Sequence, residues 1–97
     1  MELGTTVMTV GIAKAMERDF YFKTFVLDSF ERYERHDWGE LCEEDKDEND
    51  RALKEGNRVF ASYNLPPYLR GLFPDDKIWI ITEWDRSVTT ILFPEEY

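Results

Sequence analysis

The sequence predicts an α+β fold, with two or three helices packed on a small antiparallel sheet that includes a C-terminal β-hairpin. Helix-spaced apolar residues occupy the first half of the chain, and two runs rich in β-branched residues lie close together near its end. A chain of 97 residues suits a single domain, residues 1–97, with one core. Its hydrophobic content of 42% supplies the apolar area that such a core requires.

The N-terminal third predicts a strand followed by helical segments. The run TTVMTV at residues 5–10 is rich in β-branched residues and predicts a short strand, while IAKAMER after Gly11 is helical in character. Beyond Asp19, which suits an N-cap, apolar residues recur at spacings of three and four. This pattern predicts an amphipathic helix that ends near His36. Its apolar residues are Phe22, Phe25, Val26, Phe30 and Tyr33.

The middle of the chain is strongly acidic. Between Glu40 and Glu55 there are eight acidic and three basic residues, a net charge of −5. A helical stripe of apolar residues continues beyond this segment, so we expect a second helix from about Glu43 to Tyr63. The stripe consists of Ala52, Leu53, Gly56, Val59, Phe60 and Tyr63.

The segment from Asn64 to Asp76 contains three prolines and one glycine, which predicts an irregular connector. Four of its large apolar residues should lie on the core or form an exposed apolar contact. They are Tyr68, Leu69, Leu72 and Phe73.

Two strands, Lys77–Glu83 and Ser87–Phe93, are predicted to form the C-terminal hairpin around a polar turn at Asp85 and Arg86. Neither face of the hairpin is clearly polar, which suggests substantial burial of both faces. Since an isolated hairpin is marginally stable, residues 5–10 are the natural third strand.

Charge and cysteine content limit the function classes. With 21 acidic and 12 basic residues, the chain carries a net charge of −9, which repels phosphate backbones and anionic lipid surfaces. Direct nucleic-acid binding and membrane binding are therefore disfavoured, whereas good solubility and a basic protein partner are both compatible with this charge. One cysteine, Cys42, excludes an intramolecular disulfide and favours a reducing compartment. No apolar run is long enough for a membrane span and no signal-like start is present, so we expect a cytoplasmic protein.

Catalytic and metal-binding signals are weak. The single histidine, His36, suits a surface position at a helix end, and one histidine with one cysteine cannot complete a metal site. The acids around Cys42 discourage its thiolate. The acidic run 43–50 lacks the glycine and glutamate spacing of a calcium loop. We therefore expect no metal and no cofactor, and a cryptic hydrolase is the third and weakest function class.

The hairpin turn is a candidate ligand site. Trp84, Asp85, Arg86 and Ser87 bring together an aromatic ring, charges and a hydroxyl, so Arg86, Trp84 and Arg70 could form the pocket of a small-ligand or nucleotide-binding module. The alternative is structural: Asp85 and Ser87 cap the turn, and Trp84 packs on the adjacent helix.

The tail KIWIITEWDRSVTTILFPEEY, the opening GTTVMTVGI and the internal DWGELCEEDKDEN resemble a family of small uncharacterised bacterial proteins of plasmids, prophages and other mobile elements. The resemblance spans nearly the whole chain and is weakest over residues 64–76. It brings no catalytic residues. It implies an accessory or counter-defence role, in which small acidic proteins can imitate DNA and occupy a basic groove.

These observations favour a non-enzymatic binding protein, an inhibitor of restriction or CRISPR-type machinery, that engages a basic protein through its acidic helix. Homodimerisation is compatible with the sequence. The residues expected to contact the partner are Glu43, Glu44, Asp47, Glu48 and Asp50.

Overall fold

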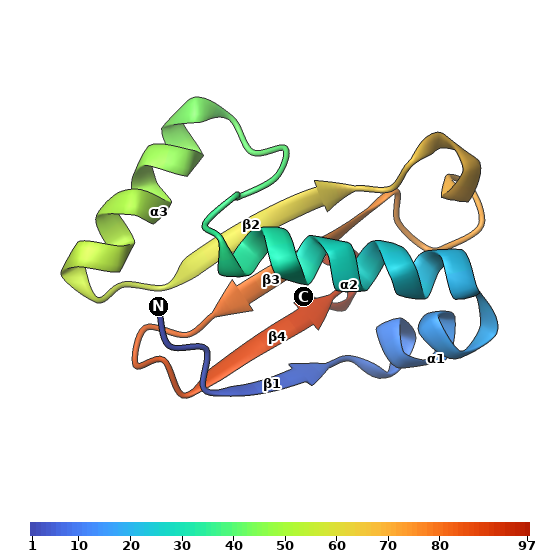
Figure 1. Cartoon of the computed structure of the whole chain (residues 1–97), viewed down its shortest axis with the longest axis horizontal. Helices are drawn as coiled ribbons and strands as arrows, with labels where there is room; N and C mark the ends of the chain where they lie inside the picture. Colours follow the sequence, from blue (N-terminus) through green and yellow to red (C-terminus); the bar gives the residue numbers. More distant parts are fainter.

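The computed structural model describes all residues from Met1 to Tyr97 and is an α+β fold (Figure 1). It has three helices and four strands, and two short 3-10 turns lie in the C-terminal half of the chain. The elements are β1 (Thr5–Met8), α1 (Val10–Arg18), α2 (Phe20–Glu34), α3 (Glu43–Glu55), β2 (Val59–Asn64), η1 (Pro67–Leu69), β3 (Lys77–Thr82), β4 (Val88–Leu92) and η2 (Pro94–Glu96).

The four strands form one sheet in the order β1-β4-β3-β2. The predicted C-terminal hairpin is confirmed, since β3 and β4 pair antiparallel with Ile80 opposite Ile91. The predicted third strand also joins the sheet, but β1 lies parallel to β4, so the sheet is mixed and the expectation of a purely antiparallel sheet was wrong. Parallel neighbours require a long crossover connection, and here all three helices and two strands lie between β1 and β4 along the chain.

Helix α2 runs across one face of the sheet, with α1 beside it at one end and α3 at the opposite end near β2 (Figure 1). Its predicted N-cap is confirmed, because Asp19 Oδ1 accepts a hydrogen bond from the Phe22 N–H at 3.0 Å. The predicted apolar side of α2 faces the sheet: Phe22, Val26 and Tyr33 are fully buried. They pack with inward-facing residues of the strands, which include Val59, Ala61, Tyr63, Ile78, Ile80, Ile91 and Phe93.

The predicted helix from Glu43 to Tyr63 is too long, because α3 ends at Glu55 and residues 59–64 form strand β2. Gly56 ends the helix in a left-handed conformation with a φ of 74°, and its N–H returns to the Ala52 carbonyl. Such a glycine is the usual helix stop signal. Beyond it, Val59, Ala61 and Tyr63 are buried on the core face of β2. The apolar spacing in the sequence therefore spans two elements of different period, helix α3 and strand β2.

The connector lies partly on the core and partly in solvent, as its composition suggested. Leu69 is buried, and the Phe73 ring lies 4.4 Å from the ring centre of Phe22. Tyr68 and Leu72 are exposed. None of the helices is both long and apolar enough to cross a membrane.

The helices cover one face of the sheet. On the other face, the expected burial of the hairpin depends on contacts among side chains of the sheet and the C-terminal residue. There Ile81 and Leu92 are buried without a helix above them. Trp79 packs edge-on against both Phe60 and Tyr97 on this face. Tyr97, the last residue of the chain, thus helps to cover it.

A chain of hydroxyl groups crosses the buried interior from α2 to the N-terminal segment. Tyr33 OH lies 2.6 Å from Thr82 Oγ1, which lies 2.8 Å from Thr89 Oγ1, and Thr89 donates to the Leu3 carbonyl at 2.7 Å. Because that carbonyl can only accept, each hydroxyl must donate toward Leu3 in turn. All four groups are therefore satisfied by a single directed chain.

This arrangement predicts alkaline instability. Burial raises the pKa of Tyr33 to about 12, whereas a tyrosine in the unfolded chain has a pKa of about 10. The stabilising contribution of the neutral phenol is thus complete below about pH 10 and is lost as the pH rises toward about 12. Tyr33→Phe should lower the free energy of unfolding by about 1–2 kcal/mol at neutral pH.

The difference between the wild type and Tyr33→Phe should shrink in urea titrations above about pH 10. Tyr68→Phe, at an exposed tyrosine, is the matched control and should follow the wild type at every pH. A constant difference across the alkaline range would contradict the role given to the buried phenol.

Candidate protein-binding site

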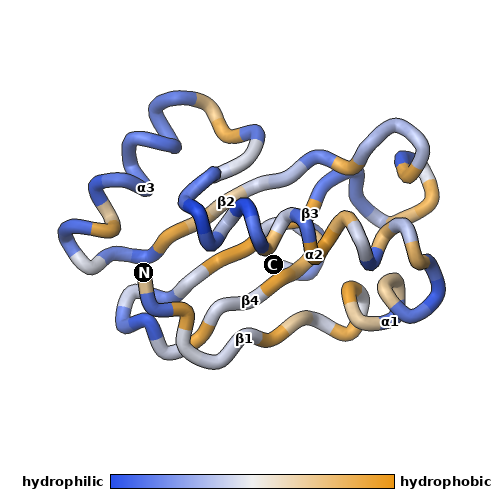
Figure 2. The backbone as a smooth tube through the Cα atoms, viewed as in Figure 1, coloured by the Kyte–Doolittle hydropathy of each residue, from blue (hydrophilic) through white to orange (hydrophobic).

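The acidic residues of α3 form an exposed surface, which we call the α3 acidic surface. All five residues expected to contact a partner, Glu43, Glu44, Asp47, Glu48 and Asp50, are exposed, and so are Asp45 and Glu55. Figure 2 shows α3 as hydrophilic over most of its length and set at one end of the molecule. Two ion pairs lie within it, Lys46 with Glu43 at 3.8 Å and Arg51 with Glu48 at 2.9 Å.

Asn49 anchors the buried side of α3 to the outer edge of β2. Its side-chain amide accepts a hydrogen bond from the Phe60 N–H at 3.1 Å and donates to the Phe60 carbonyl at 2.5 Å. One side chain thus satisfies both outward-facing backbone groups of Phe60 in the way that a neighbouring strand would. Asn49 and Ala52 are the buried residues of this helix.

The C-terminal end of α3 is capped by Arg86 from the hairpin turn. Its guanidinium donates to the carbonyls of Asn57 at 2.7 Å, Glu83 at 3.1 Å and Ala52 at 3.2 Å. A cation at this place satisfies open carbonyl groups and opposes the negative end of the helix dipole. The helix is therefore fixed to the hairpin as well as to β2.

The loop of residues 35–42 leads into α3 and also contacts the middle of that helix. Trp38 is buried and donates from Nε1 to Asp50 Oδ1 at 3.1 Å. The loop itself bonds along the edge of β2, since the Glu40 N–H donates to the Ser62 carbonyl at 2.7 Å and the Ser62 N–H donates to the Trp38 carbonyl at 3.4 Å. Asp50 thus has a structural contact that the other four predicted partner-binding residues lack.

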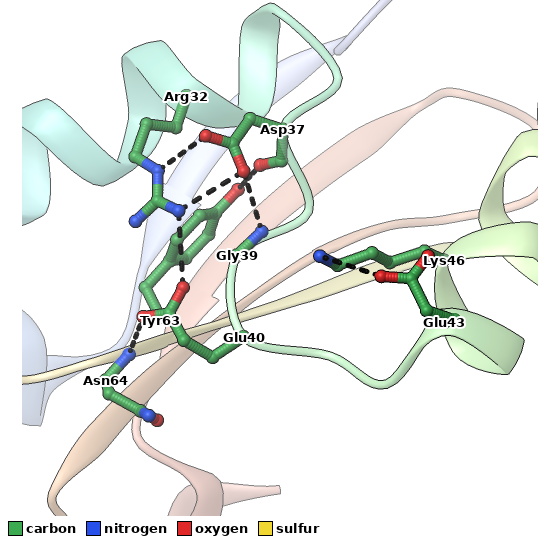
Figure 3. Close-up of polar contacts among 8 residues, drawn as sticks. All are labelled: Arg32, Asp37, Gly39, Glu40, Glu43, Lys46, Tyr63 and Asn64. Carbon is green, nitrogen blue, oxygen red and sulfur yellow. Dashed lines mark hydrogen bonds and ion pairs between the residues drawn. The ribbon is translucent and has the colours of Figure 1, made fainter.

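Arg32 organises this loop, as Figure 3 shows. It donates to both Asp37 carboxylate oxygens, at 2.8 and 3.2 Å, and to Glu40 at 3.2 Å. Its guanidinium carbon lies 5.1 Å from the centre of the Tyr63 ring, and Tyr63 OH donates to the Asp37 carbonyl at 2.8 Å. Glu40 in turn accepts the Asn64 N–H at 2.9 Å. The cluster joins α2, the loop and β2.

The electrostatics of the cluster follow from these contacts. Hydrogen bonding to Arg32 holds the pKa of the Asp37 carboxyl below its usual range. Its contribution to stability is therefore present above the ordinary carboxyl pKa and is lost as the pH falls. Because both side chains are about one-third or more exposed, solvent screening keeps this contribution small. The cluster therefore holds the loop against β2.

The hairpin-turn residues lie together, and their contacts favour the structural alternative to a ligand site. Asp85 Oδ1 accepts from both the Ser87 N–H at 3.0 Å and the Ser87 hydroxyl at 2.6 Å, which lowers the pKa of Asp85. Arg86 directs its donors to backbone carbonyls, as described above. Trp84 is 67% exposed, so the expectation that it packs on a helix was wrong. Arg70, the other suggested pocket residue, donates to the Leu65 carbonyl at 3.1 Å.

His36 and Cys42 lie near the loop but do not form a site. His36 has a φ of 63° just beyond α2 and stacks on the Trp38 ring at 5.1 Å. Cys42 is exposed at the start of α3. No group of three or more His, Cys, Asp or Glu residues is placed to hold a metal ion.

The surface hollows are shallow. One of about 400 Å³ lies between α1 and the connector, where Lys14, Arg18 and Phe73 are among its lining residues. Another of about 240 Å³ lies on the sheet face without helices, between Arg58, Trp79 and Tyr97. A third, of about 460 Å³, is lined only by polar residues, namely Asn64, Arg70, Asp75, Asp76 and Lys77. It contains Arg70 but neither Trp84 nor Arg86, so the suggested pocket residues do not line one hollow.

The sequence alone did not reveal the residues that mount α3, namely Arg32, Trp38, Asn49, Tyr63 and, in its capping role, Arg86. Asn49 was recognisable as the only uncharged polar residue among the seven residues from Asp45 to Arg51. Its partner in β2, however, depends on the tertiary fold.

Comparison with models of protein families, with curated proteins and with solved structures found no match. The resemblance to small mobile-element proteins therefore stays a prediction.

Proposed function

We propose that this chain is a non-enzymatic binding protein that uses the α3 acidic surface to occupy the DNA-binding groove of a basic protein. The observation that carries the proposal is the presentation of seven exposed carboxylates on one helix of 13 residues. A surface that served only solubility would need no such concentration of charge, nor a helix fixed both to β2 and to the hairpin turn.

The spacing of these carboxylates supports DNA mimicry. A helix of 13 residues is about 20 Å long, so its seven acids fall at about one per 3 Å of axis. The phosphates of one B-DNA strand recur about every 3.4 Å along the helix axis. Three basic residues on α3 reduce its net charge to −4.

Rigidity supports the same proposal. Binding costs less conformational entropy when the interacting groups are already held in place. Asn49 and Trp38, which bonds to Asp50, fix the middle of α3, and Arg86 fixes its C-terminal end. The resemblance to mobile-element proteins favours a partner among host or element-encoded DNA-binding proteins, with restriction and CRISPR-type nucleases as the first candidates.

The test is displacement of labelled duplex DNA from purified restriction and CRISPR-type nucleases. Wild-type protein should displace the DNA from its partner. Replacing Glu43, Glu44, Asp47 and Glu48 by Lys should weaken displacement roughly 100-fold, because four attractive charges become repulsive. Asp50 is left unchanged, since it accepts the Trp38 hydrogen bond.

The matched control reverses four exposed acids elsewhere, Glu17, Asp28, Glu31 and Glu34, which have no side-chain hydrogen bond or ion pair. It changes the net charge equally and should displace DNA almost as well as the wild type. Circular dichroism checks that both variants fold. An equal loss of displacement in the two variants would mean that net charge alone causes the effect. A wild type that fails to displace DNA from every nuclease tested would contradict the proposal.

A further inference from the structure

The two edge strands of the sheet, β2 and β1, differ in how many of their outward-facing backbone groups are hydrogen-bonded. At the β2 edge, the outward-facing N–H and carbonyl groups of Phe60 and Ser62 and the N–H of Asn64 are already bonded: Phe60 by Asn49, Ser62 by the Trp38 and Glu40 backbone, and Asn64 by Glu40. Such covering prevents a second chain from pairing with an edge strand. The β2 edge is therefore closed.

The β1 edge is open. Thr5 and Thr9 donate their N–H groups to Ser87 and Ile91 beside β4, so alternation along the strand points the backbone groups of Thr6 and Met8 away from the sheet. All four residues of β1 are exposed. In Figure 1 no element lies beyond β1 on that side. An uncovered edge of this kind is a ready template for another strand.

The open edge is also held in a fixed conformation. At its start, Gly4 has a φ of 63°, and a Cβ there would lie 2.3 Å from the Ser87 carbonyl oxygen. At its end, the Thr9 hydroxyl donates to Glu96 at 2.6 Å, and Glu96 also accepts the Gly11 and Phe93 N–H groups. The strand is thus ordered before any partner arrives, which lowers the entropic cost of pairing.

Charge selects the occupant. Residues 3–13 carry no charged side chain, in a chain of which 34% is charged and whose net charge is −9. Two such acidic chains associate most readily where acidic side chains are few, because like charges oppose their approach elsewhere. Strand β1 is the sheet edge opposite to β2 and its neighbour α3. Pairing through β1 would set the two β2 strands about 34 Å apart, at roughly 4.8 Å per strand interval. That separation exceeds the Debye length of about 8 Å severalfold, so the acidic surfaces would not repel each other strongly.

We infer that two copies of this chain pair antiparallel through β1, with the two-fold axis at Val7, to form a continuous eight-stranded sheet. Thr6 of each copy lies opposite Met8 of the other, and each such pair exchanges two backbone hydrogen bonds. Val7 lies opposite its own copy on the sheet face without helices. The pairing leaves both α3 acidic surfaces free, and it holds whether or not those surfaces bind a DNA-binding protein.

Cysteine cross-linking tests the register. In a Cys42→Ser background, Val7→Cys should form a disulfide-linked dimer under mild oxidation. Opposed residues at that non-hydrogen-bonded position lie about 4.5 Å apart between Cα atoms, within the range that a disulfide spans. Thr5→Cys is the register control. The Cα atoms of residue 5 in the two copies would be about 13 Å apart, which is too far for a disulfide bond.

Sedimentation velocity over a concentration series tests the pairing itself. The wild type should show a reversible dimer, and both Thr6→Pro, which removes an outward N–H, and Val7→Lys, which opposes two cations at the axis, should weaken it at least about 10-fold. Leu72→Lys, at an exposed apolar residue of the connector, should leave dimerisation unchanged. A wild type that stays monomeric up to about 1 mM, the weakest affinity expected of a specific dimer, would overturn the inference. So would cross-linking that is as efficient for Thr5→Cys as for Val7→Cys.

Discussion

Phe22→Ala is expected to lower the free energy of unfolding by about 3–5 kcal/mol. Phe22 is fully buried and packs against three other aromatic rings, with centres at 4.4 Å for Phe73, 5.6 Å for Phe93 and 6.2 Å for Phe25. It thereby joins α2, the connector and the end of the sheet. Truncation would leave a cavity where these three parts meet, and they cannot collapse into it together.

Urea unfolding followed by circular dichroism measures this loss. Phe20→Ala is the matched control, because Phe20 belongs to the same helix but is 74% exposed. Its effect should stay within about 0.5 kcal/mol. A loss below about 1 kcal/mol for Phe22→Ala would mean that the ring cluster is not part of the core.

Asn49→Ala is expected to cost about 2–4 kcal/mol, a large effect for a single polar side chain. The substitution leaves both the N–H and the carbonyl of Phe60 without the partner that Asn49 supplies. Each unsatisfied, partly buried group costs about 1–3 kcal/mol, with some relief where water reaches it. The same change detaches the middle of α3 from β2, so the α3 acidic surface should also become more mobile.

Hydrogen exchange should accordingly show faster exchange across residues 43–55 in Asn49→Ala than in the wild type. Asn57→Ala serves as the control, since its exposed amide bonds only with Glu55, at 3.4 Å. That variant should match the wild type in stability and exchange. An Asn49→Ala protein with unchanged exchange in α3 would contradict the anchoring role.

Local signals in the sequence were sufficient for the elements whose contacts are local. The N-cap at Asp19 and the spacing of Phe22, Val26 and Tyr33 predicted α2 within one or two residues of its observed bounds. Alternating β-branched residues on both sides of Asp85 and Arg86 predicted the hairpin. In both cases the determining interactions lie within a few residues of each other, so periodicity and turn chemistry describe them fully.

Strand β2 was missed because two periods coincide by chance at the α3 boundary. Leu53, Gly56, Val59, Phe60 and Tyr63 are three or four residues apart and continue a helical stripe. The stronger signal was Gly56, a helix stop, followed by a run of β-forming residues. The direction of β1 could not be read from the sequence, since it depends on how the helices return the chain to the sheet.

The candidate site was predictable in composition but not in architecture. The concentration of acids and their exposure follow from a helix that has few apolar residues. What turns this helix into a fixed surface is long-range: Asn49 to Phe60, Trp38 to Asp50, and Arg86 to the Ala52 carbonyl. Single-sequence patterns carry no information about such pairs. For that reason the sequence suggested ligand binding as one alternative for Arg86 but did not reveal that it caps α3.

The most direct test of the central claim is the association rate between this chain and a nuclease from which the wild type displaces DNA in the proposed assay, measured by stopped flow from about 0.01 M to about 1 M salt. The Debye length falls from about 30 Å to about 3 Å over that range. If the α3 acidic surface forms the contact, the rate should fall steeply with salt for the wild type. The variant with Lys at positions 43, 44, 47 and 48 should associate slowly throughout, with a weaker salt dependence. A rate indifferent both to salt and to these four substitutions would contradict the claim.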